Sequence, residues 1–249
     1  MLLSFRKKPL RIVLAADRVI ASEARPLIFP GGVEQTGDWQ PAVQALPAIL
    51  HGRKGQAAVV LADQFARYAL LPHNDAVKTD EQWLALARHR FSALHGAVSA
   101  EWDVKVTSTA PLGPRLACAV DRELLERLMH PFVACGVQLV SVQPFLVAAF
   151  NRIRKTVGNG SCWIVVEEPG RLTLALIQRG AWVAIRSRRS DERWRIALPE
   201  ILERESAFLG LDTPCTRVIV CAQGEFDPQM HDAFRADAIS YRELALAFE

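Results

Sequence analysis

Residues 161–190 constrain the fold most, because they contain three short apolar segments in immediate succession. The expected strands are Cys162–Val166, Arg171–Ile177 and Ala181–Ser187. Two tight turns separate them, Glu167–Gly170 and Gln178–Gly180, in which Pro and Gly supply the backbone angles that a chain reversal needs. The stretch therefore predicts an antiparallel meander that leads into a helix, expected over residues 191–209.

The first half of the chain contains a weaker version of the same plan. Leu10–Leu14 and Arg18–Glu23 are expected to be strands joined around Asp17, and residues 25–37, rich in Pro and Gly, are expected to be a loop. Asp38 is a suitable cap for a helix that runs to about His51. We therefore expect two related halves that face a cleft, 1–157 and 161–249, with the Gly-rich segment 158–160 as their boundary.

The segment between these two patterns predicts further strands and helices. Ala57–Leu61 and Arg67–Leu71 are expected to pair as a hairpin around residues 63–65. Thr79 and Gln82 have the spacing of a capping box at the start of a helix that ends near Gly96. The remaining expected elements are a strand pair at 101–107 and 115–120, a helix at 122–135 capped by Asp121, a strand at 137–142, a helix that begins at Pro144, a strand at 217–222, a short helix at 227–234 and a helix at the end of the tail. The alternation of strand and helix over 115–157 predicts a parallel strand in the sheet.

Composition and charge exclude several classes of protein. The 249 residues are half hydrophobic and 23% charged, which indicates a folded globular chain. A formal net charge of +3 is too small to indicate nucleic-acid binding. The most apolar region, 128–150, is interrupted by polar residues and two prolines, so we do not expect it to span a membrane. The five cysteines form no C-x-x-C pair and are expected to be reduced, buried thiols of a cytosolic protein.

Signals for catalysis and metal binding are weak. His89 and His95 are six positions apart, so they face different sides of the expected helix, and no metal site is expected. A G-x-S-x-G nucleophile motif is absent from the sequence. Glu167 and Glu168 are adjacent carboxylates with two interpretations, acid/base chemistry or solvation of a turn, and the second is the commoner one. No catalytic residue is therefore predicted.

Three segments carry a resemblance to a known family. They are Phe5-Arg6-Lys7-Lys8 leading into Ile12-Val13-Leu14, the segment from Val59 to Pro72 with its Phe-x-Arg-Tyr-x-Leu-Leu-Pro pattern, and the meander. The chain resembles the PilM-like and MshI-like proteins of type IV pilus biogenesis and the cytoplasmic domain of GspL-type secretion proteins. This resemblance implies an α/β, actin-like (ribonuclease H-like) duplicated fold with two subdomains around a cleft.

The resemblance also bears on whether the chain binds a nucleotide. Active actin-like proteins hold phosphate and magnesium with an Asp-x-Gly turn in each half. The residues that match those positions here are Asp17, Glu168, Gly170 and Gly224. The first turn lacks glycine and has Arg18 after Asp17, and the second has lost one amide donor to Pro169. We therefore expect a degenerate ATPase without cofactor, and the alternative is a working ATPase that binds ATP and magnesium at these residues.

The relatives bind the cytoplasmic tail of an inner-membrane partner and help to connect it to the assembly ATPase. The resemblance implies the same kind of scaffold here, with a PilN-like partner and a place in the cytoplasm at the inner membrane. A GspL-type protein continues into a membrane helix, so the chain is expected to be either a stand-alone protein or a cytoplasmic part.

Six residues are candidates for partner binding, and both groups have a purely structural alternative. Phe65, Arg67 and Tyr68 belong to the best-matching segment, although aromatic residues beside a strand are often core residues. Arg186, Arg188 and Arg189 belong to the densest basic cluster of the sequence. That cluster suits an acidic partner tail or anionic lipid headgroups, but a solvated strand end is the commoner explanation of such a cluster.

Overall fold

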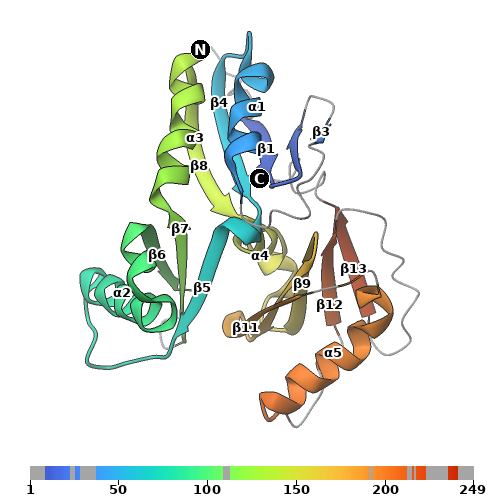
Figure 1. The fold of residues 1–249 in the computed structure, drawn as a ribbon. Helices are drawn as coiled ribbons and strands as arrows, with labels where there is room; N and C mark the ends of the chain where they lie inside the picture. Colours follow the sequence, from blue (N-terminus) through green and yellow to red (C-terminus); the bar gives the residue numbers. More distant parts are fainter. Residues whose placement is uncertain are drawn as a thin grey trace, which may run out of the picture.

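The structure is a computed structural model that describes residues 9–22, 26–28, 38–108, 113–189, 191, 193–211, 215, 217–222 and 235–240. Among these residues the strands form three sheets, and the helices lie on the faces of the sheets (Figure 1). The fold is α/β, as the sequence predicted.

The first sheet has the strand order β3-β2-β1-β4-β8. Its strands are β1 (Leu10–Leu14), β2 (Arg18–Ala21), β3 (Leu27–Ile28), β4 (Gly55–Leu61) and β8 (Val137–Pro144). The strands β1, β2 and β3 are antiparallel neighbours, whereas β4 runs parallel to both β1 and β8. Strand β3 lies inside the segment that the sequence predicted to be loop. The parallel strand that the sequence pattern predicted is present.

The second sheet repeats this arrangement with the order β11-β10-β9-β12-β13. Its strands are β9 (Ser161–Glu168), β10 (Arg171–Gln178), β11 (Ala181–Arg189), β12 (Arg217–Ala222) and β13 (Arg235–Ser240). The first three strands form the predicted antiparallel meander, and β12 runs parallel to β9 and β13. Strand β13 was not predicted, and the helices expected at 227–234 and at the end of the tail lie outside the described residues.

A smaller third sheet, ordered β5-β7-β6, is inserted between β4 and β8 of the chain. It comprises β5 (Ala66–Leu71), β6 (Trp102–Ser108) and β7 (Arg115–Asp121). Helix α2 (Asp80–His95) covers one face and is followed by a 3-10 segment, η2 (Gly96–Glu101). The predicted capping box is present, with Thr79 Oγ1 accepting from the amide of Gln82 at 3.2 Å.

The hairpin predicted between residues 57–61 and 67–71 is wrong. Strand β4 pairs with β1 and β8 in the first sheet, whereas β5 pairs with β7 in the third. The chain passes from one sheet to the other through a short 3-10 turn, η1 (Asp63–Phe65). The physical reason is that β4 is a central strand with a parallel neighbour on each side, so no edge of β4 remains for β5.

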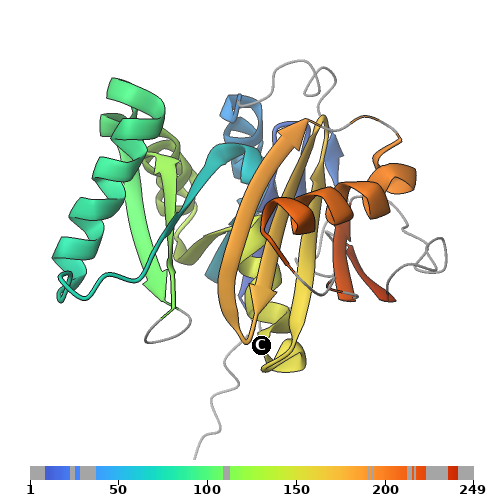
Figure 2. The same ribbon diagram turned by 90° about the horizontal axis from the view of Figure 1, so that it is seen from below.

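The helices pack on the sheets in layers. Helices α1 (Gln40–Leu50) and α3 (Arg122–Ala134) cover one face of the first sheet, and α5 (Trp194–Phe208) covers the outer face of the second. Helix α4 (Phe145–Val157) lies between these two sheets, and its apolar side chains belong to a core that contains residues of both halves. Figure 2 shows α2 and α5 on opposite sides of the molecule. A division into two domains at 158–160 stays a prediction.

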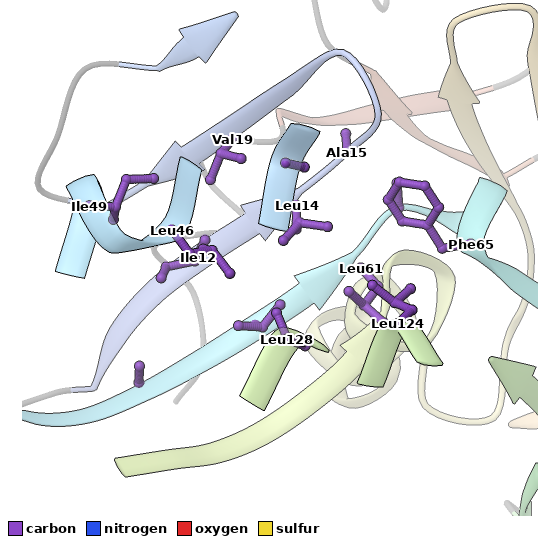
Figure 3. Packing of buried hydrophobic residues seen from close by; sticks show 14 of the residues in the cluster. Ile12, Leu14, Ala15, Val19, Leu46, Ile49, Leu61, Phe65, Leu124 and Leu128 are labelled. Carbon is purple, nitrogen blue, oxygen red and sulfur yellow. The ribbon is translucent and has the colours of Figure 1, made fainter. Parts of the chain in front are cut away.

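The core under α1 and α3 shows why these helices form where they do. Leu46 and Ile49 of α1 lie over strand β1, and Leu124 and Leu128 of α3 lie over strand β4, all in one buried cluster (Figure 3). The spacing of three and four positions places each pair on one side of its helix. Asp121 caps α3 as predicted, accepting from the amide of Glu123 at 2.8 Å. Among the described residues, no helix has both the length and the apolar character needed to cross a membrane.

Candidate functional site

The carboxyl ends of several parallel strands meet at one place between the halves. Strands β1, β4 and β8 end there with parallel registers, and the amide of Ala62 donates to the carbonyl of Leu14 at 2.9 Å. Strand β9 of the second half ends beside them at Glu168. Ligands of open α/β sheets bind at such strand ends, so functional polar groups are expected here.

Asp63, the first residue of η1, lies at the centre of this place. Its side chain is fully buried, and its Oδ1 accepts a hydrogen bond from the hydroxyl of Tyr68. The same oxygen accepts from the amide of Leu146, in the first turn of α4, at 3.0 Å. Asp63 therefore ties the connection between β4 and β5 to the connection between β8 and α4.

Glu168 brings the second half into the same cluster. Only 2% of the residue is exposed, and its Oε1 accepts from the backbone amide of Asp63 at 2.7 Å. We call the cluster of Asp63, Tyr68, Leu146 and Glu168 the joint, because it hydrogen-bonds residues 105 positions apart in sequence and in different halves. Asp63 Oδ2 and Glu168 Oε2 have no hydrogen-bond partner among the described residues.

Burial sets the protonation of the two carboxyl groups. It raises the pKa of Asp63 to about 6, against the opposing effect of the Tyr68 hydroxyl, the amides of α4 and the charge of Arg171. Burial, and next the negative charge of Asp63, raise the pKa of Glu168 to about 8. Two carboxylates this close in a desolvated place do not both ionise easily. At neutral pH the joint therefore favours one negative charge over two, and the pKa of Glu168 is raised further than that of Asp63.

The predicted nucleotide-contact residues are not gathered around an open site in the described part of the chain. Asp17 is 5% exposed and accepts from Arg18 Nε at 2.8 Å. Glu168 belongs to the joint. Gly170 has φ +71°, as the third position of a Pro-Gly turn between paired strands requires. Gly224 lies outside the described residues.

The predicted partner-binding residues of the first half are mostly internal. Phe65 is 6% exposed and packs in the core of the first sheet (Figure 3). Tyr68 belongs to the joint, and burial raises its pKa. Arg67 is half-buried and donates to the carbonyls of Gln64 and Ala66, each at 3.0 Å, while burial, and next the charge of Arg171, lower its pKa. Their packing agrees with the structural alternative that the sequence left open.

The predicted basic cluster lies along β11, an edge strand of the second sheet. Arg186 is exposed and lies 3.9 Å from the carboxylate of Glu205 on α5. Arg189 stands opposite Arg171 in the register of β10 and β11, and Arg188 is half-buried. Strand β11 packs beside β5, the strand that carries Arg67 and Tyr68.

A groove that the sequence did not predict opens beside α4. Its volume is about 930 Å³, the size of a pocket for a small molecule or a few side chains. The free face of β6 and β7 forms one wall, and Leu125 and Met129 of α3 lie beside it. Helix α4 forms the other wall through Val147 and Phe150, and the floor is mostly apolar. We call this space the groove.

The rim of the groove carries polar groups with an excess of positive charge. Lys105 lies on β6, and Arg154 and Lys155 lie at the end of α4. On β8 and α4, the amide groups of Gln143 and Asn151 hydrogen-bond each other at 3.3 Å beside the apolar floor. An apolar floor with a few polar groups around it is the usual composition of a recognition site.

Sequence reasoning missed both Asp63 and the groove. Asp63 follows the wholly apolar run from Val59 to Ala62, and an isolated carboxylate at the end of a buried strand was a usable signal. The groove gave no such signal, because its residues come from eight helices and strands spread over residues 61–182.

Comparison with known proteins gives structural neighbours only. No family model matches the chain, and no curated protein matches it. Among solved structures, the PilM-PilN type IV pilus biogenesis complex matches with a TM-score of 0.65 at 10% identity, over 94% of this chain and 88% of that chain. The cytoplasmic domain of EpsL, an inner membrane component of the type II secretion system of Vibrio cholerae, matches with a TM-score of 0.56 at 11% identity, over 95% of this chain and 92% of that chain.

A Bacteroides thetaiotaomicron protein with an actin-like ATPase fold and unknown function matches with a TM-score of 0.54 at 11% identity, over 92% of this chain and 88% of that chain. Each likeness extends over nearly the whole chain. At these identities they show the fold, which is actin-like, as the sequence resemblance implied.

Proposed function

We propose that this actin-like chain is a non-catalytic scaffold of a type IV pilus or type II secretion assembly platform. It acts on the cytoplasmic side of the inner membrane and binds the cytoplasmic tail of a PilN-like membrane protein, with the assembly ATPase as a further contact. The observation that carries the proposal is the apolar groove beside α4, in a fold that matches the PilM-PilN complex over 94% of the chain.

The shape and chemistry of the groove suit a short peptide segment. Apolar side chains of the segment would replace water along the floor, where each fully buried aliphatic side chain contributes about 1.5–3 kcal/mol. The amides of Gln143 and Asn151 are placed to bond the main chain of the segment. Fold alone does not fix function, so the proposal rests on this site.

The surroundings of the two hairpin turns support the absence of nucleotide chemistry. A phosphate-binding turn needs free amides and a carboxylate that faces the metal. Here Asp17 is paired with Arg18, Glu168 is buried in the joint, and Pro169 has no amide hydrogen. These described residues fit ATP and magnesium poorly, and no catalytic step is assigned to them.

The groove is tested by titrating the purified protein against a fluorescent peptide of the partner's cytoplasmic tail. We expect saturable binding by fluorescence anisotropy, and about 10- to 100-fold weaker binding for Met129→Arg, because a charge then enters the apolar wall. The matched control is Val133→Arg, one turn further along α3, where the side chain is 73% exposed and does not line the groove. Equal affinities of the two variants would contradict the assignment of the groove.

A further inference from the structure

Two elements at the joint begin without a side-chain cap of their own. Turn η1 follows Ala62, and helix α4 follows Pro144, and neither of these residues accepts a capping hydrogen bond through its side chain. The first amides of a helix have no partner inside the helix, so a buried helix start requires an acceptor from elsewhere.

Each start receives a carboxylate from another part of the chain. Glu168 Oε1 accepts from the amide of Asp63 at the start of η1, at 2.7 Å. Asp63 Oδ1 accepts from the amide of Leu146 in the first turn of α4, at 3.0 Å. The two caps are in series, because the residue that Glu168 caps is the residue that caps α4.

Helix α4 is the element through which this series reaches the groove. Its first turn is held at the joint, and the next residues, Val147, Phe150 and Asn151, line the groove. Helix α4 also packs against the second sheet, where Phe150 meets Trp182 of β11 with ring centroids 4.6 Å apart, and Trp182 itself lines the groove. The orientation of α4 therefore depends on both halves.

We propose that Asp63 and Glu168 are positioning residues for the groove. Glu168 of the second half fixes the turn that carries Asp63, and Asp63 fixes the first turn of α4, so the second half sets the wall against which the partner's tail binds. This inference rests on the proposed function, because it names the control of the same groove.

The other polar groups near the joint agree with these roles. Tyr68 donates its hydroxyl hydrogen to the oxygen of Asp63 that caps α4 and thereby restrains the carboxylate. Arg171, at the start of β10, donates to Ser187 Oγ at 3.0 Å, and Arg67 donates to backbone carbonyls of its own turn. Neither arginine hydrogen-bonds Asp63 or Glu168, so within the described residues backbone amides and Tyr68 hold the two carboxylates.

The test compares two neutral replacements of similar volume, Glu168→Gln and Glu168→Met. The glutamine keeps an oxygen acceptor for the amide of Asp63, whereas the methionine offers only a weakly accepting thioether sulfur. Hydrogen–deuterium exchange is measured by mass spectrometry on peptides that cover residues 145–150, and the affinity for the tail peptide is measured in parallel. We expect Glu168→Gln to match the wild type, and Glu168→Met to exchange about tenfold faster at 145–150 and to bind the tail about tenfold more weakly.

Hydrogen–deuterium exchange tests the positioning roles of Glu168 and Asp63 even if the tail peptide does not bind. A wild-type protein that does not bind the tail contradicts the proposed function, whereas unchanged exchange at 145–150 in Glu168→Met contradicts the inference. Faster exchange that is equal in α2 and α5 also contradicts it, because that result indicates general destabilisation. If Glu168→Met does not fold, Asp63→Asn and Asp63→Leu repeat the comparison, since only the asparagine keeps the acceptor for Leu146.

Discussion

The two five-stranded sheets share one topology but differ in strand length and in what is inserted between their strands. In each, three antiparallel strands are followed by two strands that run parallel to the first. The meander of the second sheet has strands of eight, eight and nine residues, whereas β2 and β3 of the first have four and two. The first half instead carries the inserted third sheet, which supplies one wall of the groove. The first half therefore supplies most of the groove, and the second half adds Ile177, Gly180 and Trp182 to its lining.

The hairpin turns of the two halves also differ, in the partners that their carboxylates bind. Each turn has a carboxylate before or within it and an arginine at the start of the next strand: Asp17 with Arg18, and Glu168 with Arg171. The first carboxylate pairs with its own neighbour, and the second reaches across to the other half. Both carboxylates therefore have structural partners inside the protein, which agrees with the proposed absence of nucleotide chemistry.

The largest expected effect is a pH dependence of stability that arises from Glu168, in the second half. Glu168 has a pKa of about 8 in the folded protein, above the ordinary value of 4.5, so the folded state keeps a proton that the unfolded chain has lost. Its stabilising contribution is complete below the unfolded pKa and is lost as pH rises through the folded pKa. We expect the free energy of unfolding to fall by about 2 kcal/mol between pH 6 and pH 8, measured by urea denaturation.

Glu168→Gln should remove most of this dependence and leave the protein more stable than the wild type at pH 8. Glu203→Gln is the control, because Glu203 is exposed on α5 in the same half. A wild-type stability that is flat from pH 6 to pH 8 would show that Glu168 is not protonated at the joint.

A smaller effect distinguishes the backbones of the two turns. Gly170→Ala should cost about 1 kcal/mol, because φ is +71° there, while the space around the new Cβ is open. Ala16→Gly in the first turn should cost about 0.5–1 kcal/mol for another reason, since Ala16 has no positive φ and glycine adds freedom to the unfolded chain. Both costs are to be measured by thermal unfolding. A Gly170→Ala variant that is more stable than the wild type would contradict the positive φ described for this turn.

Local sequence signals predicted those parts of the fold that depend on local chemistry. The Pro-Gly turn, the Thr79 and Gln82 capping box and the Asp121 cap each involve residues within four positions of one another, and all three form as predicted. The hairpin at 57–71 failed because the run 57–61 is buried on both faces, as in a central parallel strand, and the polar position Asp63 marks a change of sheet.

The candidate site was predicted less well, because it is made by contacts between distant residues. Glu168 was identified as a candidate nucleotide-contact residue through the family resemblance, but its hydrogen bond to Asp63 links positions 105 residues apart. Tyr68 was identified for partner binding, and the structure places it in the joint. The groove depends on where α3, α4 and the third sheet come together, which no single segment encodes.

The most direct test of the account is thermal unfolding with and without millimolar magnesium ATP. A site with a dissociation constant near 10 μM would add about 2.7 kcal/mol at a hundredfold excess of ligand, which corresponds to about 5–10 °C. The account predicts an unchanged melting temperature. A shift of several degrees that disappears in Gly170→Arg would place nucleotide between the two turns and contradict the scaffold proposed here.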